Sequence, residues 1–168
     1  MKTHIINCSE VTYPVGLNMS SAMKFVKEVY KFIKDNDDFR GRDINLLCTG
    51  SSGSIIASLL FAELDQENVF VCHIKKDGES SHAGNNFRLS SLDDINVIID
   101  DFSSSGETIE RIYSKVKQYN SDIDINYLIL SGIGTDSVYI IKEVIQPQHI
   151  VSSKQGIDNF NNPGYESN

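Results

Sequence analysis

Two adjacent acids followed by a turn rich in hydroxyl groups form the stretch of this chain with the most evident chemistry. Asp100 and Asp101 end an apolar run, and residues 103–108 then supply four hydroxyl groups and a glycine before an amphipathic segment begins. Carboxylates accept hydrogen bonds from sugar hydroxyls and bind hard cations. Backbone N–H groups in a glycine-containing turn at a helix N-terminus bind phosphate. The spacing therefore predicts a site for a phosphorylated sugar with vicinal hydroxyls.

A second turn of small residues follows an earlier apolar run. Residues 46–53 are Leu-Leu-Cys-Thr-Gly-Ser-Ser-Gly, so that Gly50 and Gly53 flank two hydroxyl side chains. Glycines let the backbone amides of such a turn approach an anion closely. Turns of this composition also serve as structural connections, so the segment taken alone leaves both interpretations open.

A long polar segment, residues 75–91, begins with the basic pair Lys75 and Lys76 and contains His82. Connections of this length are usually lids, binding loops or disordered segments. The lysines could bring positive charge to an anionic ligand, and the histidine could donate a hydrogen bond or a proton. Solvated side chains in a polar loop are the alternative for all three.

Apolar runs alternate with amphipathic segments along the chain, and these elements must position the residues above. We expect strands at about 44–49, 69–74, 97–100, 123–130 and 149–151, and helices at about 18–34, 50–64, 107–119 and 136–145. The alternation predicts an α/β fold with a doubly wound, Rossmann-like parallel sheet flanked by helices. The acids would then lie at the carboxyl end of a strand, where open α/β sheets bind their ligands.

The length of 168 residues predicts a single domain. Residues 1–17 contain a short apolar piece and a Pro/Gly turn, so we expect an irregular segment or a hairpin there. Residues 158–168, rich in Asn, are expected to form a mobile tail.

The composition argues against several classes of partner. A net charge of −8 with no basic stripe is unsuited to DNA binding. No apolar stretch approaches the length of a membrane span or a signal peptide. Cys8, Cys48 and Cys72 form no C-x-x-C pair, and the last two lie in apolar runs. Reduced core cysteines and a cytoplasmic location are therefore expected.

Residues 97–109 resemble the phosphoribosyl pyrophosphate (PRPP) signature of the type I phosphoribosyltransferases. That signature is a hydrophobic strand, two acids, two variable residues, a Ser/Thr-rich turn, Gly, any residue and Thr. This chain has Val-Ile-Ile, Asp-Asp, Phe-Ser, Ser-Ser, Gly, Glu and Thr in that order. An ordinary strand–turn–helix connection is the alternative. The resemblance implies the type I phosphoribosyltransferase fold with a small hood, here residues 1–17 and 148–165. It also implies transfer of a 5-phosphoribosyl group from PRPP to a nucleobase with release of diphosphate.

The resemblance further implies roles for individual residues. Asp100 and Asp101 would act at the ribose hydroxyls and at Mg²⁺, directly or through water. Lys75, Lys76 and His82 would act on the leaving diphosphate from a mobile catalytic loop. The implied PRPP contacts are Thr49, Gly50 and Ser51 at the diphosphate, and Ser103, Ser104, Ser105, Gly106, Glu107 and Thr108 at the 5-phosphate. The implied partners are the two small-molecule substrates and a second copy of the chain in a homodimer.

Two positions depart from particular subgroups of the family. Glu79 stands near the place of a lysine in the loop of the orotate enzymes, and a carboxylate there would repel diphosphate. Ser104 stands where the hypoxanthine-guanine enzymes carry an acid. Orotate and the 6-oxopurines of the hypoxanthine-guanine type are therefore disfavoured as acceptors, whereas adenine, xanthine and pyrimidines other than orotate stay open.

Two other classes of protein are alternatives to an enzyme of this kind. One is a non-catalytic, PRPP- or nucleotide-binding regulatory protein on the same fold. The other is a different nucleotide-binding Rossmann-like protein, against which the lack of a G-x-G-x-x-G or Walker A sequence argues. The fold alone does not separate an enzyme from a sensor.

Overall fold

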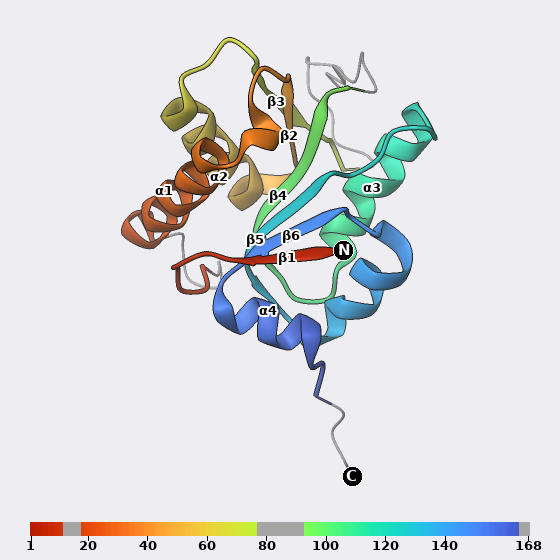
Figure 1. The fold of residues 1–168 in the computed structure, drawn as a ribbon. Coiled ribbons are helices and arrows are strands. Elements are labelled where there is room, and N and C mark those ends of the chain that lie inside the picture. The colour runs from red at the N-terminus through yellow and green to blue at the C-terminus, as the bar shows by residue number, and fades with distance from the viewer. Residues whose placement is uncertain (12–17, 77–92, 165–168) are drawn as a thin grey trace.

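The computed structural model describes residues 1–11, 18–76 and 93–164, and Figure 1 shows how their elements are arranged. The core is a six-stranded sheet in the order β1-β6-β5-β4-β2-β3, and its described pairings are all parallel. The strands are β1 (Lys2–Ile5), β2 (Ile44–Cys48), β3 (Val69–His73), β4 (Ile95–Ser103), β5 (Tyr127–Ile133) and β6 (His149–Ser152). The predicted parallel sheet is therefore confirmed.

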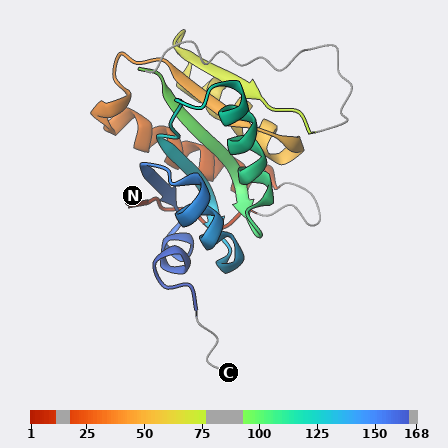
Figure 2. The same cartoon turned by 90° about the vertical axis from the view of Figure 1, so that its right-hand side faces the viewer.

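Helices cover both faces of this sheet. α1 (Met19–Asp35) and α2 (Gly50–Leu64) lie on one face, and α3 (Glu107–Tyr119) lies on the other, nearer the viewer in Figure 2. Along β4, Val97 and Ile99 pack into the core on the α1–α2 side, whereas Ile98 packs on the α3 side. All three side chains are fully buried. Burial on both faces explains why this strand is an unbroken apolar run in the sequence.

The connection between β5 and β6 differs from the α-helix predicted at 136–145. A 3₁₀ turn (Thr135–Ser137) leads into a π-helical segment (Ile140–Ile145). Ile141 and Ile145 are buried in the core on the α3 side. The apolar residues that predicted an α-helix are therefore buried by a π-helical turn, which is wider than an α-helical one.

Both ends of the chain also differ from the prediction. Instead of an irregular segment or hairpin, residues 2–5 form the edge strand β1, which pairs with β6. Its residues are mostly exposed, so they lack the apolar alternation that reveals a strand.

Helix α4 (Lys154–Asn161) occupies the start of the segment expected to be a tail. The Ser153 hydroxyl caps it by accepting a hydrogen bond from the Gly156 N–H at 3.2 Å, and Phe160 is buried. Residues 165–168 lie outside the described part of the chain. Among the described helices, none has the length and apolarity that a membrane crossing requires.

Candidate functional site

A pocket of about 340 Å³ lies at the carboxyl edge of β2, β3 and β4. Four segments meet in it: the turn after β2, the segment after β3, the end of β4 and the first turn of α3. Its lining residues are Thr49, Gly50, Ser51, Ser52, Lys76, Asp100, Asp101, Phe102 and Thr108. The pocket thus brings together members of all three groups that the sequence singles out.

The acid pair belongs to β4, which continues through both residues to Ser103 instead of ending at Asp100 as predicted. Asp100 and Asp101 are only 5% and 6% exposed, and the N–H of Asp101 donates to Oδ1 of Asp100 at 2.8 Å. Burial raises the pKa of the Asp100 carboxyl well above its ordinary value, and the side chain of Asp101 adds to the rise through a hydrogen bond and its charge. The hydrogen bond from the Asp101 N–H opposes the rise. Two nearly buried neighbouring carboxyls are suited to receive a cation or hydroxyl donors.

The turn after β2 closes against this acid pair. Gly50 begins α2 with a φ of 72°, a conformation that glycine adopts without strain. A β-carbon at Gly53 would lie 3.2 Å from Oδ1 of Asp100, so the first turn of α2 lies directly beside that carboxyl. The Thr49 hydroxyl donates to the carbonyl of Ile74 at 2.5 Å and ties the turn to the end of β3. Gly50 and the exposed Ser51 of this turn line the pocket.

Of the predicted loop at residues 75–91, the structure describes Lys75 and Lys76. Lys76 is exposed and lines the pocket, whereas Lys75 is half-buried and is not among the described lining residues. His82 and Glu79 lie outside the described residues.

The turn after β4 presents exposed hydroxyls and a glycine with a positive φ at the start of α3. Ser104 and Ser105 are exposed, and the Ser105 hydroxyl accepts a hydrogen bond from the N–H of Glu107 at 3.3 Å. Gly106 is the N-cap of α3 with a φ of 87°. As a glycine it has no side chain to cover the helix N-terminus. Thr108 lines the pocket, and residues 103–107 form the turn next to it.

The end of β5 holds this turn in place. The Gly134 N–H donates to the carbonyl of Ser103 at 2.7 Å, and the Ser137 hydroxyl donates to the same carbonyl at 3.3 Å. A β-carbon at Gly134 would lie 2.9 Å from the carbonyl oxygen of Ser104. The close approach of two backbones gives the turn a defined shape before any ligand binds.

The pocket combines groups that can bind an anion with the two carboxyls of the acid pair. The N-termini of α2 and α3 both contribute to the lining, and each carries a partial positive charge from its helix dipole. Lys76 adds a full positive charge. The two carboxyls lie along the same edge, so one ligand could meet anion-binding groups and hydroxyl acceptors together.

The acid pair fits a Mg²⁺ ion that shares its shell with a ligand. Among the described residues, no group of three or more His, Cys, Asp or Glu side chains could hold a metal ion. Mg²⁺ is commonly bound by one or two carboxylates together with water and substrate phosphates. Asp100 and Asp101 therefore suit an ion that arrives with a polyphosphate.

Sequence reasoning missed Phe102, which occupies a variable position of the signature. Its half-buried ring lines the pocket beside the acids. The segment after β1 belongs to the expected hood at residues 1–17, but its contact with β5 was not predicted: the Val11 N–H donates to Ser131 Oγ at 2.8 Å. That hydroxyl in turn donates to the backbone carbonyl of Asp101. No local pattern connects residue 11 with residue 131, so sequence alone held no signal for this contact.

The cysteines take no part in the pocket. All three are free, with Cys48 and Cys72 buried and Cys8 half-buried. Burial raises the pKa of the Cys8 and Cys48 thiols to about 11, so both stay protonated near neutral pH and are poor nucleophiles.

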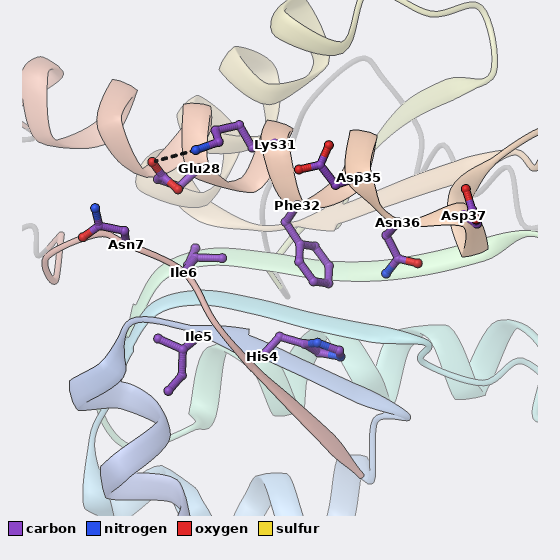
Figure 3. A pocket seen from close by; sticks show the side chains of 10 residues that line it. All are labelled: His4, Ile5, Ile6, Asn7, Glu28, Lys31, Phe32, Asp35, Asn36 and Asp37. Carbon is purple, nitrogen blue, oxygen red and sulfur yellow. Dashed lines mark ion pairs between the residues drawn. The ribbon is translucent and has the colours of Figure 1, made fainter.

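A larger pocket, of about 770 Å³, lies between β1 and α1 (Figure 3). The rings of His4 and Phe32 lie next to each other there, with centroids 5.0 Å apart and planes tilted by 59°. This pocket shares no lining residue with the one at the acid pair. Although this pocket is larger, none of the predicted site residues lines it.

Solved structures of phosphoribosyltransferases are similar to this chain. Adenine phosphoribosyltransferase from Saccharomyces cerevisiae, in complex with an imino-altritol bisphosphate and adenine, has a TM-score of 0.57 at 14% identity, covering 81% of this chain and 79% of that one. Purine phosphoribosyltransferase from Pyrococcus horikoshii has a TM-score of 0.54 at 18% identity, covering 83% and 86%. Xanthine-guanine-hypoxanthine phosphoribosyltransferase from Helicobacter pylori has a TM-score of 0.51 at 14% identity, covering 90% and 87%.

No protein-family model matches the chain, and no curated protein sequence matches it. The structural likeness is one of fold, since the identities are low. The chain therefore has the α/β fold of the type I phosphoribosyltransferases, as the motif at 97–109 implies.

Proposed function

We propose that this chain transfers a 5-phosphoribosyl group from PRPP to a nitrogen of a nucleobase and releases diphosphate. The observation that carries the proposal is the single pocket joining the acid pair, two helix N-termini and Lys76. The similar structures support it, because they are named as adenine, purine and xanthine-guanine-hypoxanthine phosphoribosyltransferases.

The shape of PRPP suits the order of groups along this edge of the sheet. The molecule carries a phosphate at one end, a diphosphate at the other and two ribose hydroxyls between them. We assign the 5-phosphate to residues 103–108 and the diphosphate to residues 49–51 with Lys76. We assign the ribose hydroxyls to Asp100 and Asp101, whose carboxylates accept hydrogen bonds when ionised.

The reaction forms a bond between the acceptor nitrogen and C1 of the ribose while the bond from C1 to a diphosphate oxygen breaks. The electron pair of the broken bond leaves with the diphosphate, and the proton of the acceptor nitrogen passes to diphosphate or water. In the transition state the ribose is partly cationic, so the carboxylates beside it are favourable. The α2 N-terminus and Lys76 stabilise the charge that develops on the leaving group. Asp100 and Asp101 would hold Mg²⁺, which would supply positive charge to neutralise part of the charge of the diphosphate.

We assign the loop after β3 to the departure of diphosphate. Lys76 lines the pocket where that group would lie, and Lys75 and His82 stay predicted contributors to the same step. Closure of a loop over the substrates would exclude water and so protect the ribosyl cation from hydrolysis.

Titration of PRPP with and without Mg²⁺, followed by assays of diphosphate release with a panel of free bases, tests the proposal. We expect Mg²⁺-dependent binding and release with at least one base. Asp101→Asn should lower turnover by about a hundredfold or more, because a charge beside the transition state is lost. Asp124→Asn changes an exposed aspartate near the amino edge of the sheet and should leave turnover unchanged. Tight PRPP binding without release for any base would favour the non-catalytic regulator, and no PRPP binding would reject both.

A further inference from the structure

An exposed carboxylate outside the PRPP motif lies over the carboxyl edge of the sheet. Glu10 belongs to the segment after β1, and the next residue, Val11, is hydrogen-bonded to Ser131 of β5 at 2.8 Å. The Ser131 hydroxyl also donates to the backbone carbonyl of Asp101 in β4. The backbone that carries Glu10 is thus held one strand away from the acid pair.

Gly132 shows where the Glu10 side chain lies. It pairs with Phe102 across β4 and β5 and is buried. A β-carbon at Gly132 would lie 2.6 Å from Cγ of Glu10 and 2.7 Å from Cδ2 of Phe102. The side chains of Glu10 and Phe102 therefore both occupy the space above Gly132 and are neighbours of each other.

This arrangement sets a carboxylate beside an aromatic wall of the pocket. Phe102 lines the pocket together with Asp100 and Asp101. An aromatic face offers a planar heterocycle a surface for stacking, and a carboxylate accepts hydrogen bonds from N–H groups. The same carboxylate repels a ligand that is itself an anion.

We propose that Glu10 and Phe102 form the acceptor side of the site. They select a neutral, planar base whose edge presents N–H donors, and they exclude bases that carry a carboxylate. This inference rests on the proposed phosphoribosyl transfer and adds to it the residue that selects the acceptor. It also agrees with the argument from Glu79 against orotate, from a different part of the chain.

The test compares acceptors while PRPP binding is measured separately. Diphosphate release at saturating Mg²⁺ and PRPP is measured with adenine, uracil and orotate, and PRPP affinity is measured by titration. The wild type should prefer the better of the two neutral bases to orotate. Glu10→Gln keeps the size of the side chain but loses its charge. It should lower kcat/KM for that neutral base by about tenfold or more, narrow the preference over orotate and leave the Kd for PRPP unchanged.

Two further variants sharpen the comparison. Phe102→Leu keeps an apolar side chain but removes the stacking surface, so it should raise KM for the neutral base. Glu67→Gln makes the same carboxylate-to-amide change at an exposed glutamate in the turn before β3. It should alter neither kcat/KM for the acceptor bases nor the Kd for PRPP.

The outcomes distinguish an error in the acceptor site from an error in the PRPP site. An unchanged preference in Glu10→Gln, an equal loss for both kinds of base, or a wild-type preference for orotate would overturn the role of Glu10. A weaker Kd for PRPP in this variant would overturn it too, because Glu10 would then serve the PRPP site. PRPP binding without release for any base, or no PRPP binding, would overturn the proposed transfer and the acceptor site together. Release with a neutral base that is equally fast in the wild type and in Glu10→Gln would overturn the acceptor site alone.

Discussion

Gly106 meets two requirements at the start of α3 that other residues do not satisfy together. Its φ of 87° lies in the left-handed region, which costs an L-residue about 1–2 kcal/mol. A β-carbon there would also lie 3.0 Å from Cβ of Ile140 in the segment after β5. Gly41 has a similar φ of 71° but nothing within 4 Å of the position of a β-carbon. A side chain at Gly41 would therefore meet backbone strain alone, whereas a side chain at Gly106 would meet both backbone strain and a close contact with Ile140.

Gly106→Ala should destabilise the fold by about 1 kcal/mol or more beyond the loss in Gly41→Ala, because only position 106 combines strain with overpacking. Urea unfolding of both variants measures the difference. PRPP affinity should fall in Gly106→Ala alone, since only this glycine shapes the phosphate turn. Equal losses of stability in the two variants would contradict the role assigned to the contact with Ile140.

Among the elements, the edge strand β1 is held by side chains as well as by its ladder to β6. Nε2 of His4 lies 3.0 Å from Nδ1 of His149, whose ring stacks on Tyr127 with centroids 4.4 Å apart. The Tyr127 hydroxyl donates to Asp38 at 2.8 Å. Burial lowers the pKa of both histidines. The charge of Lys2 lowers the pKa of His4 further, and the charge of His4 lowers the pKa of His149 further, against an opposing effect of Asp38. A hydrogen bond between two imidazoles needs one unprotonated nitrogen, so it is lost when both rings are cationic.

The free energy of unfolding should therefore fall as the pH drops below about 6.5. The pKa of each histidine is lower in the folded state than its ordinary value of 6.5, so the unfolded chain binds more protons in that range. His4→Gln keeps an N–H donor toward His149 and removes one titrating ring. Its stability should decline less steeply than that of the wild type between about pH 7 and pH 5, measured by urea unfolding at each pH. Parallel declines would contradict the coupling of this pair to stability.

Across the whole molecule, the order of the strands decides where the site forms. From β2 the chain passes outward to β3 and then returns to β4 on the other side of β2. Connections that leave in opposite directions open a crevice at the carboxyl ends of two adjacent strands, and ligands of open α/β sheets bind there. The pocket at the acid pair lies at this point, between the N-termini of α2 and α3.

A ligand that spans both helix N-termini should stabilise the folded chain. At about 100 times its Kd, Mg²⁺-PRPP would add about 2.7 kcal/mol and raise Tm by about 5–10 °C for a domain of this size. Thermal unfolding with and without the ligand measures the shift, and Asp101→Asn should reduce it. An equal shift from inorganic phosphate at the same concentration would contradict a site that extends across the crevice.

The core of the fold could be predicted because its signals are contiguous. Val97, Ile98 and Ile99 are consecutive apolar residues, as a strand buried on both faces requires, and α1 shows apolar spacing on one face. The ends were harder to predict. Edge strand β1 is mostly exposed and owes its conformation to β6, more than 140 residues away. The start of α4 lies in an Asn-rich segment, and its order depends on the burial of Ile157 and Phe160 against the sheet.

The acid pair and the glycine turn that follows it could be predicted from the sequence itself, because a strand, two carboxylates and a glycine turn are all encoded within residues 97–109. Only the tertiary structure decided which distant groups face that motif. The strand order places the turn at residue 50 and Lys76 at the same edge. The hydrogen bond from the Val11 N–H to the Ser131 hydroxyl holds the segment of Glu10 near Phe102. Such contacts depend on packing between segments far apart in the chain, so a local pattern of residues does not predict them.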